Sequence, residues 1–130
     1  AAGNGALVIG GKSMGGRMAS LVADESGADG LICLGYPFHP PGKPDKLRTE
    51  HLESITCPTL ILQGERDPFG TRPEVENYPL SAAITIEWLP DGNHDLSPRK
   101  ASGHTAASNM AATISAAVKF LELAAQAPKT

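Results

Sequence analysis

Four short apolar runs, separated by stretches with helical periodicity, restrict the fold of this chain more than any other feature. They cover residues 6–10, 30–35, 59–63 and 84–89. The first three are continuously apolar rather than alternating, as in parallel strands buried on both faces. Helical patterns cover residues 16–25, 47–54, 71–80 and 105–126, and the last places on one face Met110, Ile114, Val118 and Leu121. This alternation predicts an α/β fold of about four parallel strands flanked by helices, with ligands at the carboxyl ends of the strands.

A serine follows the first apolar run, in Gly11-Lys12-Ser13-Met14-Gly15, where the pattern changes from strand to helix. A serine at such a turn is a nucleophile elbow, strained in its backbone and exposed at its hydroxyl, and small residues two positions away on each side allow close packing. Gly11 and Gly15 take those positions. The Met14 backbone N–H would begin the helix and could donate to an oxyanion. The motif predicts Ser13 as nucleophile and Met14 as oxyanion donor.

The same residues also fit a loose phosphate-loop pattern, in which Lys12 would bind phosphate and Ser13 magnesium. Such a loop needs polar, glycine-rich residues that turn their N–H groups inward, whereas residues 7–10 are Leu-Val-Ile-Gly. The apolar residues 60–62 are also followed by Gln63 and Gly64 rather than by an acidic residue that could hold magnesium. A nucleotide-binding protein is therefore the third of three functional interpretations.

An acid and a histidine follow the third and fourth apolar runs. Asp67 comes just past the run at 59–63, and His94 comes just past the run at 84–89. An activated serine needs a histidine base, and the histidine needs a carboxylate that fixes its tautomer. Taken alone, Asp67 fits an Asp-Pro turn and His94 a solvated loop. Together with the elbow they predict a triad of Ser13, Asp67 and His94.

Other ionisable residues near these loops are weaker candidates. His104 begins the last helical stretch and is the alternative base, and the alternative acids are Glu65, Asp91 and Asp95. None of these acids lies four residues beyond the end of a strand. The sequence has neither an HExxH motif nor a cluster of Cys and His ligands, so we expect no metal and no cofactor.

A proline-rich segment, YPFHPPGKP at residues 36–44, follows the second apolar run. It contains too much proline for a helix or an inner strand, which predicts a stiff loop on the same rim as the nucleophile. The candidate substrate-rim residues are Lys12, His39, Lys43 and Arg48. The alternative for each is an ordinary solvated surface residue.

Charge and composition narrow the expected partners. The 130 residues carry a formal net charge of −3, and their basic residues are scattered. This argues against nucleic acid or an anionic membrane and favours a small-molecule substrate. No apolar run is long enough to span a membrane, and Cys33 and Cys57 lack CxxC spacing. We expect one cytoplasmic domain with reduced cysteines.

The motifs taken together resemble the α/β-hydrolase superfamily. They are the elbow GGKSMGGR, the rim segment GYPFHPPGKPDKLRTEHL, the acid turn LQGERDPFG and the histidine loop PDGNHDL. They look like those of predicted bacterial hydrolases in the dienelactone-hydrolase-like branch, and the likeness covers essentially the whole chain. It implies a serine hydrolase acting on an ester, lactone or related acyl substrate. Some relatives are scaffold subunits, so a non-catalytic protein-interaction domain is the alternative.

The resemblance also implies that residues 1–130 are the C-terminal portion of a single α/β-hydrolase domain. Domains of this kind have further strands and a glycine-rich oxyanion loop before the elbow strand, and the chain begins immediately before that strand. One oxyanion donor would then be missing, and the first strand would be an open edge. We expect this portion alone to self-associate through that edge or to show little turnover.

Overall fold

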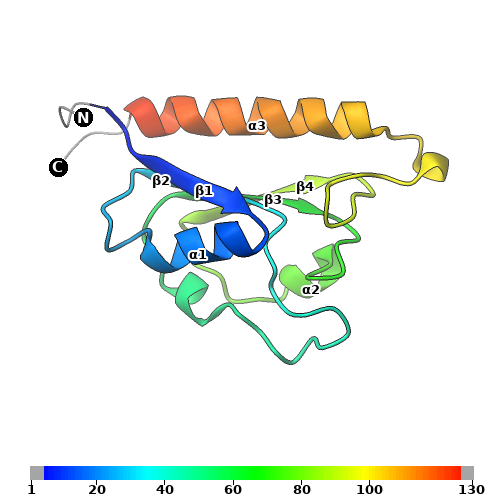
Figure 1. Cartoon of the computed structure of the whole chain (residues 1–130), viewed down its shortest axis with the longest axis horizontal. Helices are drawn as coiled ribbons and strands as arrows, with labels where there is room; N and C mark the ends of the chain where they lie inside the picture. The colour runs from blue at the N-terminus through cyan, green and yellow to red at the C-terminus, as the bar shows by residue number, and fades with distance from the viewer. Residues whose placement is uncertain (1–4, 127–130) are drawn as a thin grey trace.

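A computed structural model describes residues 5–126, which form one parallel sheet with helices on both faces (Figure 1). The strands are β1 (Val8–Lys12), β2 (Gly30–Leu34), β3 (Thr59–Gly64) and β4 (Ile84–Leu89). They are hydrogen-bonded in the order β1-β2-β3-β4, and each pair is parallel. The predicted α/β fold with four parallel strands is confirmed.

Three crossovers lie on one face of the sheet and one long helix lies on the other (Figure 1). The crossovers contain α1 (Met14–Val22), the 3-10 helix η1 (Glu50–Glu53) and α2 (Arg72–Val75). Parallel crossovers are right-handed, so a strand order that steps in a single direction places all of them on the same face. After β4 the chain passes through the 3-10 helix η2 (Lys100–Ser102) and returns as α3 (Ala106–Gln126) over the opposite face.

Two expected helices are much shorter than their sequence patterns suggest. The stretch at 47–54 forms only η1, and the stretch at 71–80 forms only α2. Thr71 and Glu74 form a capping box at the start of α2. Beyond α2, Asn77 and Tyr78 donate to carbonyls three residues back, the tighter pattern with which short helices end.

The main core lies between the sheet and the crossover helices. Its buried residues are Ala23, Leu31, Cys33, Tyr36, Phe38, Leu52, Ile55, Cys57, Ile61 and Val75. A smaller cluster of Leu60, Leu62 and Leu89 lies on the α3 face. Each large buried side chain contributes roughly 1.5–3 kcal/mol of transfer free energy, so the crossover face holds most of the fold together. Cys33 and Cys57 are buried free thiols.

α3 packs on the sheet through a narrow stripe and leaves its most apolar face in solvent. Its buried residues are Asn109, Thr113 and Ala124. By contrast, the four residues of the apolar face are each between 43% and 56% exposed, and they are Met110, Ile114, Val118 and Leu121. The apolar pattern of α3 therefore does not mark its contact with this sheet.

β1 is the least buried of the first three strands, although its sequence is as continuously apolar as the others. Its residues are exposed or half-buried, whereas every residue of β3 is buried. Among residues 5–126, β1 has β2 as its single strand neighbour. A shallow hollow of about 280 Å³ follows the exposed side of β1 and β2. The expectation of burial on both faces is wrong for β1 because this strand lies at an edge.

Candidate active site

Ser13 occupies the sharp turn between β1 and α1, at the carboxyl edge of the sheet. Its φ is 52° and its ψ is −121°, a conformation that few residues other than glycine adopt. Its backbone N–H donates to the Leu34 carbonyl at 2.8 Å, which ties the turn to the end of β2. The serine is therefore held in a strained position by the neighbouring strand.

The close approach of β1 and α1 needs glycine at positions 11 and 16. A Cβ on Gly11 would lie 2.6 Å from the carbonyl carbon of Gly15, and a Cβ on Gly16 would lie 2.7 Å from the Gly11 oxygen. A Cβ on Gly15 would meet nothing within 4 Å. The elbow pattern thus locates the strand-side glycine correctly, but the helix-side glycine required by packing is one residue further along.

His94 lies between Ser13 and Asp67 and contacts both. Its Nε2 is 2.9 Å from Ser13 Oγ, and its Nδ1 is 2.8 Å from Asp67 Oδ2. Because an ionised carboxylate only accepts hydrogen bonds, Nδ1 carries the proton and Nε2 turns a lone pair toward the serine hydroxyl. The structure therefore brings together three side chains from the separate loops that follow β1, β3 and β4.

Asp67 is fully buried, with 0% of its surface exposed. Besides His94, its Oδ2 accepts a hydrogen bond from Gln63 Nε2 at 3.2 Å, and its Oδ1 accepts one from the Phe69 backbone N–H at 2.8 Å. Burial raises the pKa of the Asp67 carboxyl, and the hydrogen bonds from His94 and Phe69 offset only part of that rise. Hydrogen bonds thus fix the Asp67 side chain in position, while its burial disfavours the charged form of the carboxyl group.

Gln63, which was not predicted to belong to the site, donates a hydrogen bond to Asp67. Its side chain is buried and accepts from the Tyr36 backbone N–H at 2.8 Å, while its Nε2 reaches Asp67 and, at 3.1 Å, the Gly70 carbonyl. One amide therefore ties the end of β2 to the acid turn. The available signal was a polar residue at the end of an apolar strand, four positions before the acid.

Phe69 and Gly35 set the position of the histidine ring. The Phe69 ring stacks on His94 with centroids 4.3 Å apart and an interplanar angle of 10°. Gly35 has a φ of 66°, and a Cβ there would lie 3.3 Å from His94 Nδ1. These two residues come from different loops, so their proximity to His94 was not readable from sequence spacing.

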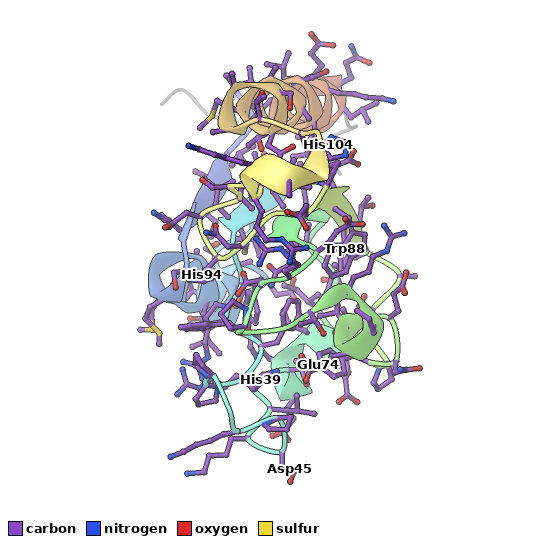
Figure 2. The ribbon with its side chains drawn as sticks, turned by 90° about the vertical axis from the view of Figure 1, so that its right-hand side faces the viewer. His39, Asp45, Glu74, Trp88, His94 and His104 are labelled. Carbon is purple, nitrogen blue, oxygen red and sulfur yellow. The ribbon has the colours of Figure 1, made fainter. Side chains whose placement is uncertain are left out.

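The four substrate-rim candidates occupy different environments. Lys12 is exposed and pairs with Asp95, with Nζ 3.0 Å from Oδ1, so it links the elbow to the histidine loop. His39 is buried, and both of its ring nitrogens are engaged, by the Pro40 carbonyl and Glu74. The His39 backbone N–H donates to the Phe69 carbonyl at 3.0 Å, so His39 lies against the acid turn, whereas Asp45 lies further below His94 in Figure 2. Lys43 is exposed and Arg48 half-buried.

The alternative acids and base are engaged elsewhere or lie apart. The three alternative acids form ion pairs of their own: Asp91 with Arg66 and Arg99, Glu65 with Arg72, and Asp95 with Lys12. His104 is exposed and lies above His94 in Figure 2. Within residues 5–126, Asp67 is the carboxylate hydrogen-bonded to the His94 ring.

Met14 begins α1 beside the serine, so its N–H lacks an acceptor within the helix. An anion at this position would also meet the positive end of the helix dipole. The phosphate-loop interpretation conflicts with the same geometry, because Val8–Lys12 form a strand paired with β2 rather than a loop that could surround phosphates.

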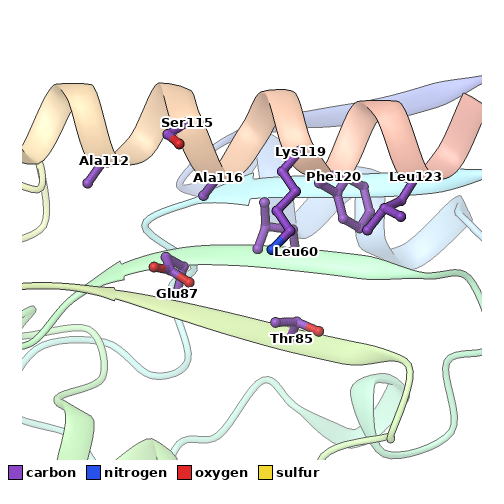
Figure 3. A pocket seen from close by; sticks show the side chains of 9 residues that line it. All are labelled: Leu60, Thr85, Glu87, Ala112, Ser115, Ala116, Lys119, Phe120 and Leu123. Atoms are coloured by element: carbon purple, nitrogen blue, oxygen red, sulfur yellow. The ribbon is translucent and has the colours of Figure 1, made fainter.

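A hollow of about 460 Å³ lies between α3 and the sheet, on the face opposite the crossovers (Figure 3). It is lined by Leu60, Thr85, Glu87, Ala112, Ser115, Ala116, Lys119, Phe120 and Leu123. Ser13, Asp67 and His94 do not line this hollow. The described residues also contain no group of three or more His, Cys, Asp or Glu side chains that could hold a metal ion, and no helix among them is long and apolar enough to cross a membrane.

Comparison with known protein families gives a match over nearly the whole chain. The family model described as an alpha/beta hydrolase domain matches residues 1–122. The matched region runs from before β1 into the last turns of α3 and includes all three residues of the hydrogen-bonded path.

Proposed function

Because the chain belongs to the alpha/beta hydrolase domain family, we propose that it carries the catalytic triad of a serine hydrolase. The observation that carries the proposal is the unbroken path from Ser13 Oγ to His94 Nε2, 2.9 Å, and from His94 Nδ1 to Asp67 Oδ2, 2.8 Å. Distances in this range allow proton transfer between the serine and the histidine.

In the first half of the reaction, Ser13 Oγ attacks the carbonyl carbon of the substrate while its proton passes to His94 Nε2. Asp67 stabilises the resulting imidazolium without taking its proton. The tetrahedral intermediate then expels the alcohol, which receives the proton from His94. An acyl group remains on Ser13.

In the second half, a water molecule attacks the acyl carbon and gives a proton to His94 Nε2. The second tetrahedral intermediate collapses, the carboxylic acid leaves, and the proton returns to Ser13 Oγ. The enzyme is thereby restored, and one water has been consumed for each ester bond broken.

The Met14 backbone N–H is the proposed oxyanion donor in both halves. It is fixed at the first position of α1, directly after the strained serine. A donor that is already oriented does not have to reorganise as charge develops on the substrate oxygen, and removal of one such donor typically costs about 10²–10³ in rate.

Esters, lactones or related acyl compounds are the proposed substrates, in line with the resemblance to the dienelactone-hydrolase-like branch. Lys12, one residue before the proposed nucleophile, pairs with Asp95, and a substrate with a negative group close to the scissile bond would compete with that carboxylate for the ammonium group. A small-molecule substrate also fits the position of the triad at the open edge of the sheet.

We further propose that the catalytic domain is completed by another segment of the protein, packed against β1 and the apolar face of α3. The support is the single strand neighbour of β1 among residues 5–126 and the exposed apolar side chains of α3. Such a segment would cover both surfaces and supply the second oxyanion donor. In its absence, residues 1–130 should associate with each other through β1.

Labelling by a fluorophosphonate tests the triad in the full-length protein. The probe forms a covalent bond only with an activated serine, so we expect one label per molecule that is absent from Ser13→Ala. Ser20→Ala is the matched control, because Ser20 also contacts a histidine but is buried. Absence of Ser13-dependent labelling in a folded sample would favour the non-catalytic interaction domain instead.

A further inference from the structure

A polar cavity, separate from the hollow between α3 and the sheet, lies along α1, between this helix, η1 and the end of the rim segment. Its volume is about 510 Å³, and it is lined by Arg17, Leu21, Leu47, Arg48, Glu50, His51 and Ser54. None of the triad residues lines it. Arg17 is nevertheless close to the proposed active site, because it lies four residues, or about 6 Å along the helix axis, from Ser13.

The two guanidinium groups of this cavity have no carboxylate partner. No ion pair within residues 5–126 involves Arg17 or Arg48, although all three of the other arginines there are paired. The Arg17 Nε is buried and lacks any hydrogen-bond partner in the described structure. Its Nη1 reaches only the weakly accepting Met14 Sδ, at 3.9 Å. The Nε is sealed from solvent, so an anion in the cavity would meet the outer nitrogens of the Arg17 guanidinium, which no oxygen of the described residues engages.

The backbone at both arginines is fixed by one polar cluster. The Ser20 hydroxyl donates to the Arg17 carbonyl at 2.5 Å, and the Tyr36 hydroxyl donates to the Arg48 carbonyl at 2.9 Å. His51 Nε2 lies between these hydroxyls, 2.7 Å from Ser20 Oγ and 3.4 Å from Tyr36 Oη. Since both hydroxyl protons are already committed to carbonyls, His51 Nε2 must be the N–H that donates to the two oxygens.

A donating Nε2 is compatible with a neutral ring, and the surroundings of His51 favour that form. Burial lowers the pKa of His51, and the nearby Arg17 lowers it further, while Glu50 opposes them. The positive charge of the cavity therefore resides on the arginines. The cluster anchors their backbones before any ligand arrives, so less ordering is needed on binding.

We propose that this cavity binds a small oxyanion of the phosphate type through the guanidinium groups of Arg17 and Arg48. Guanidinium forks match the oxygens of phosphate with two parallel hydrogen bonds each. Two such groups suit a dianion better than the single charge of a carboxylate. The exposed side chain of Glu50 also lines the cavity. Its carboxylate repels an anion and therefore lowers the affinity of the site for phosphate.

Titration calorimetry of the full-length protein with inorganic phosphate tests the site. We expect saturable binding of one phosphate, weakened about tenfold or more by Arg17→Gln and by Arg48→Gln. Acetate should bind at least several-fold more weakly than phosphate. Binding that is unchanged in both arginine variants would overturn the proposal, and equal affinity for acetate would overturn the assignment to phosphate.

Two further variants keep the test decisive if an arginine variant folds poorly. Glu50→Gln removes an opposing charge from an exposed position and should tighten phosphate binding several-fold. Lys46→Gln is the matched control, because Lys46 is an exposed cation on the same segment but does not line the cavity. If Lys46→Gln weakens binding as much as Arg48→Gln does, the attraction is diffuse and the proposed site is wrong.

Discussion

Two serine–histidine contacts, one at the turn before α1 and one within α1, look alike by distance but differ in chemistry. Ser13 Oγ lies 2.9 Å from His94 Nε2, and Ser20 Oγ lies 2.7 Å from His51 Nε2. In the first contact Asp67 fixes the proton on the far nitrogen of the ring, so the serine donates to the histidine. In the second the serine proton is committed to the Arg17 carbonyl, so the histidine donates to the serine.

The difference shows that proton direction, rather than proximity, separates a nucleophile from a structural hydroxyl. His51 has no carboxylate within hydrogen-bond distance in the described structure, and Ser20 is 4% exposed on the inner side of the helix. Ser13 has a base with a free lone pair and a strained turn at the sheet edge. His94 can therefore accept a proton from Ser13, whereas His51 cannot accept one from Ser20 in this arrangement.

The largest expected effect comes from removing the proposed nucleophile. Ser13→Ala should lower kcat for an activated ester by about 10⁴-fold or more, because the covalent step is lost. Ser20→Ala should leave kcat within about threefold and cost only about 1 kcal/mol of stability, the typical worth of one hydrogen bond. Ester turnover and thermal melting measure both. Equal losses of activity in the two variants would erase the distinction between the pairs.

Asp67→Asn should lower kcat by about 10³–10⁴-fold, because an amide no longer holds His94 in the tautomer that accepts the serine proton. Steady-state kinetics with an activated ester measure this loss. A variant with full activity would show that proton direction in the first pair does not depend on the acid.

Asp67→Asn should also change the pH dependence of stability. The pKa of Asp67 is raised above its usual value near 3.8 by burial, so the folded state binds this proton more tightly than the unfolded state does. The free energy of unfolding therefore falls as pH rises from the unfolded pKa through the folded pKa. Thermal melts from pH 3 upward should show that the stability of the wild type falls relative to that of the variant as pH rises, whatever the other carboxyl groups contribute to both profiles. Identical profiles would contradict the assignment.

Gln63→Leu tests the support of the acid. Loss of the donor to Asp67 Oδ2 should lower kcat about tenfold with little change in KM, because the amide touches the acid rather than the substrate. The Tyr36 N–H also loses its acceptor, which costs about 1–3 kcal/mol. Gln63→Glu retains an acceptor for that N–H but places a second carboxylate beside Asp67. A change in KM alone would contradict a positioning role.

The smallest expected effect concerns His39, whose two ring nitrogens contact the Pro40 carbonyl and Glu74. Burial alone would lower the pKa of His39, but hydrogen bonds to the Pro40 carbonyl and Glu74 raise it overall. The pKa of Glu74 is lowered, first by the Thr71 N–H and then by His39. Stability from the pair is present between the unfolded values, near 4.5 and 6.5. It is lost as pH rises through the folded pKa of His39 or falls through that of Glu74.

Glu74→Gln should therefore lower stability by about 1 kcal/mol near pH 5.5. This deficit should shrink at high pH, where His39 is neutral in both proteins. Thermal melts across pH 5 to 9 measure it. A deficit that stays constant would reflect only the lost cap of α2.

The order of elements and the proximity of Ser13, Asp67 and His94 followed from the sequence because both depend on local patterns. The bounds of β4 agree with the apolar run at 84–89, and each triad residue directly follows a strand. Parallel strands bring their carboxyl ends together whatever lies between them. Spacing along the chain was therefore sufficient to place Ser13, Asp67 and His94 at one edge.

Features that depend on contacts between distant segments were not predictable in this way. The need for glycine at 16 arises from the backbone of Gly11 and the side chain of Cys33. The apolar face of α3 does not coincide with its sheet contact, and η1 and α2 end earlier than their periodicity suggests. In each case tertiary packing decided the outcome over local propensity.

Ser13 directly follows β1, one of the two edge strands of the described sheet, and this has a consequence for how the proposed activity is lost on heating. Amide groups on the outer side of β1 are open to solvent exchange, and an edge strand detaches at a lower free energy than the central strands. When β1 frays, the turn that strains Ser13 relaxes and its oxygen leaves the histidine, while β2, β3 and β4 can stay folded. On heating, catalytic competence should thus disappear before the bulk of the protein melts.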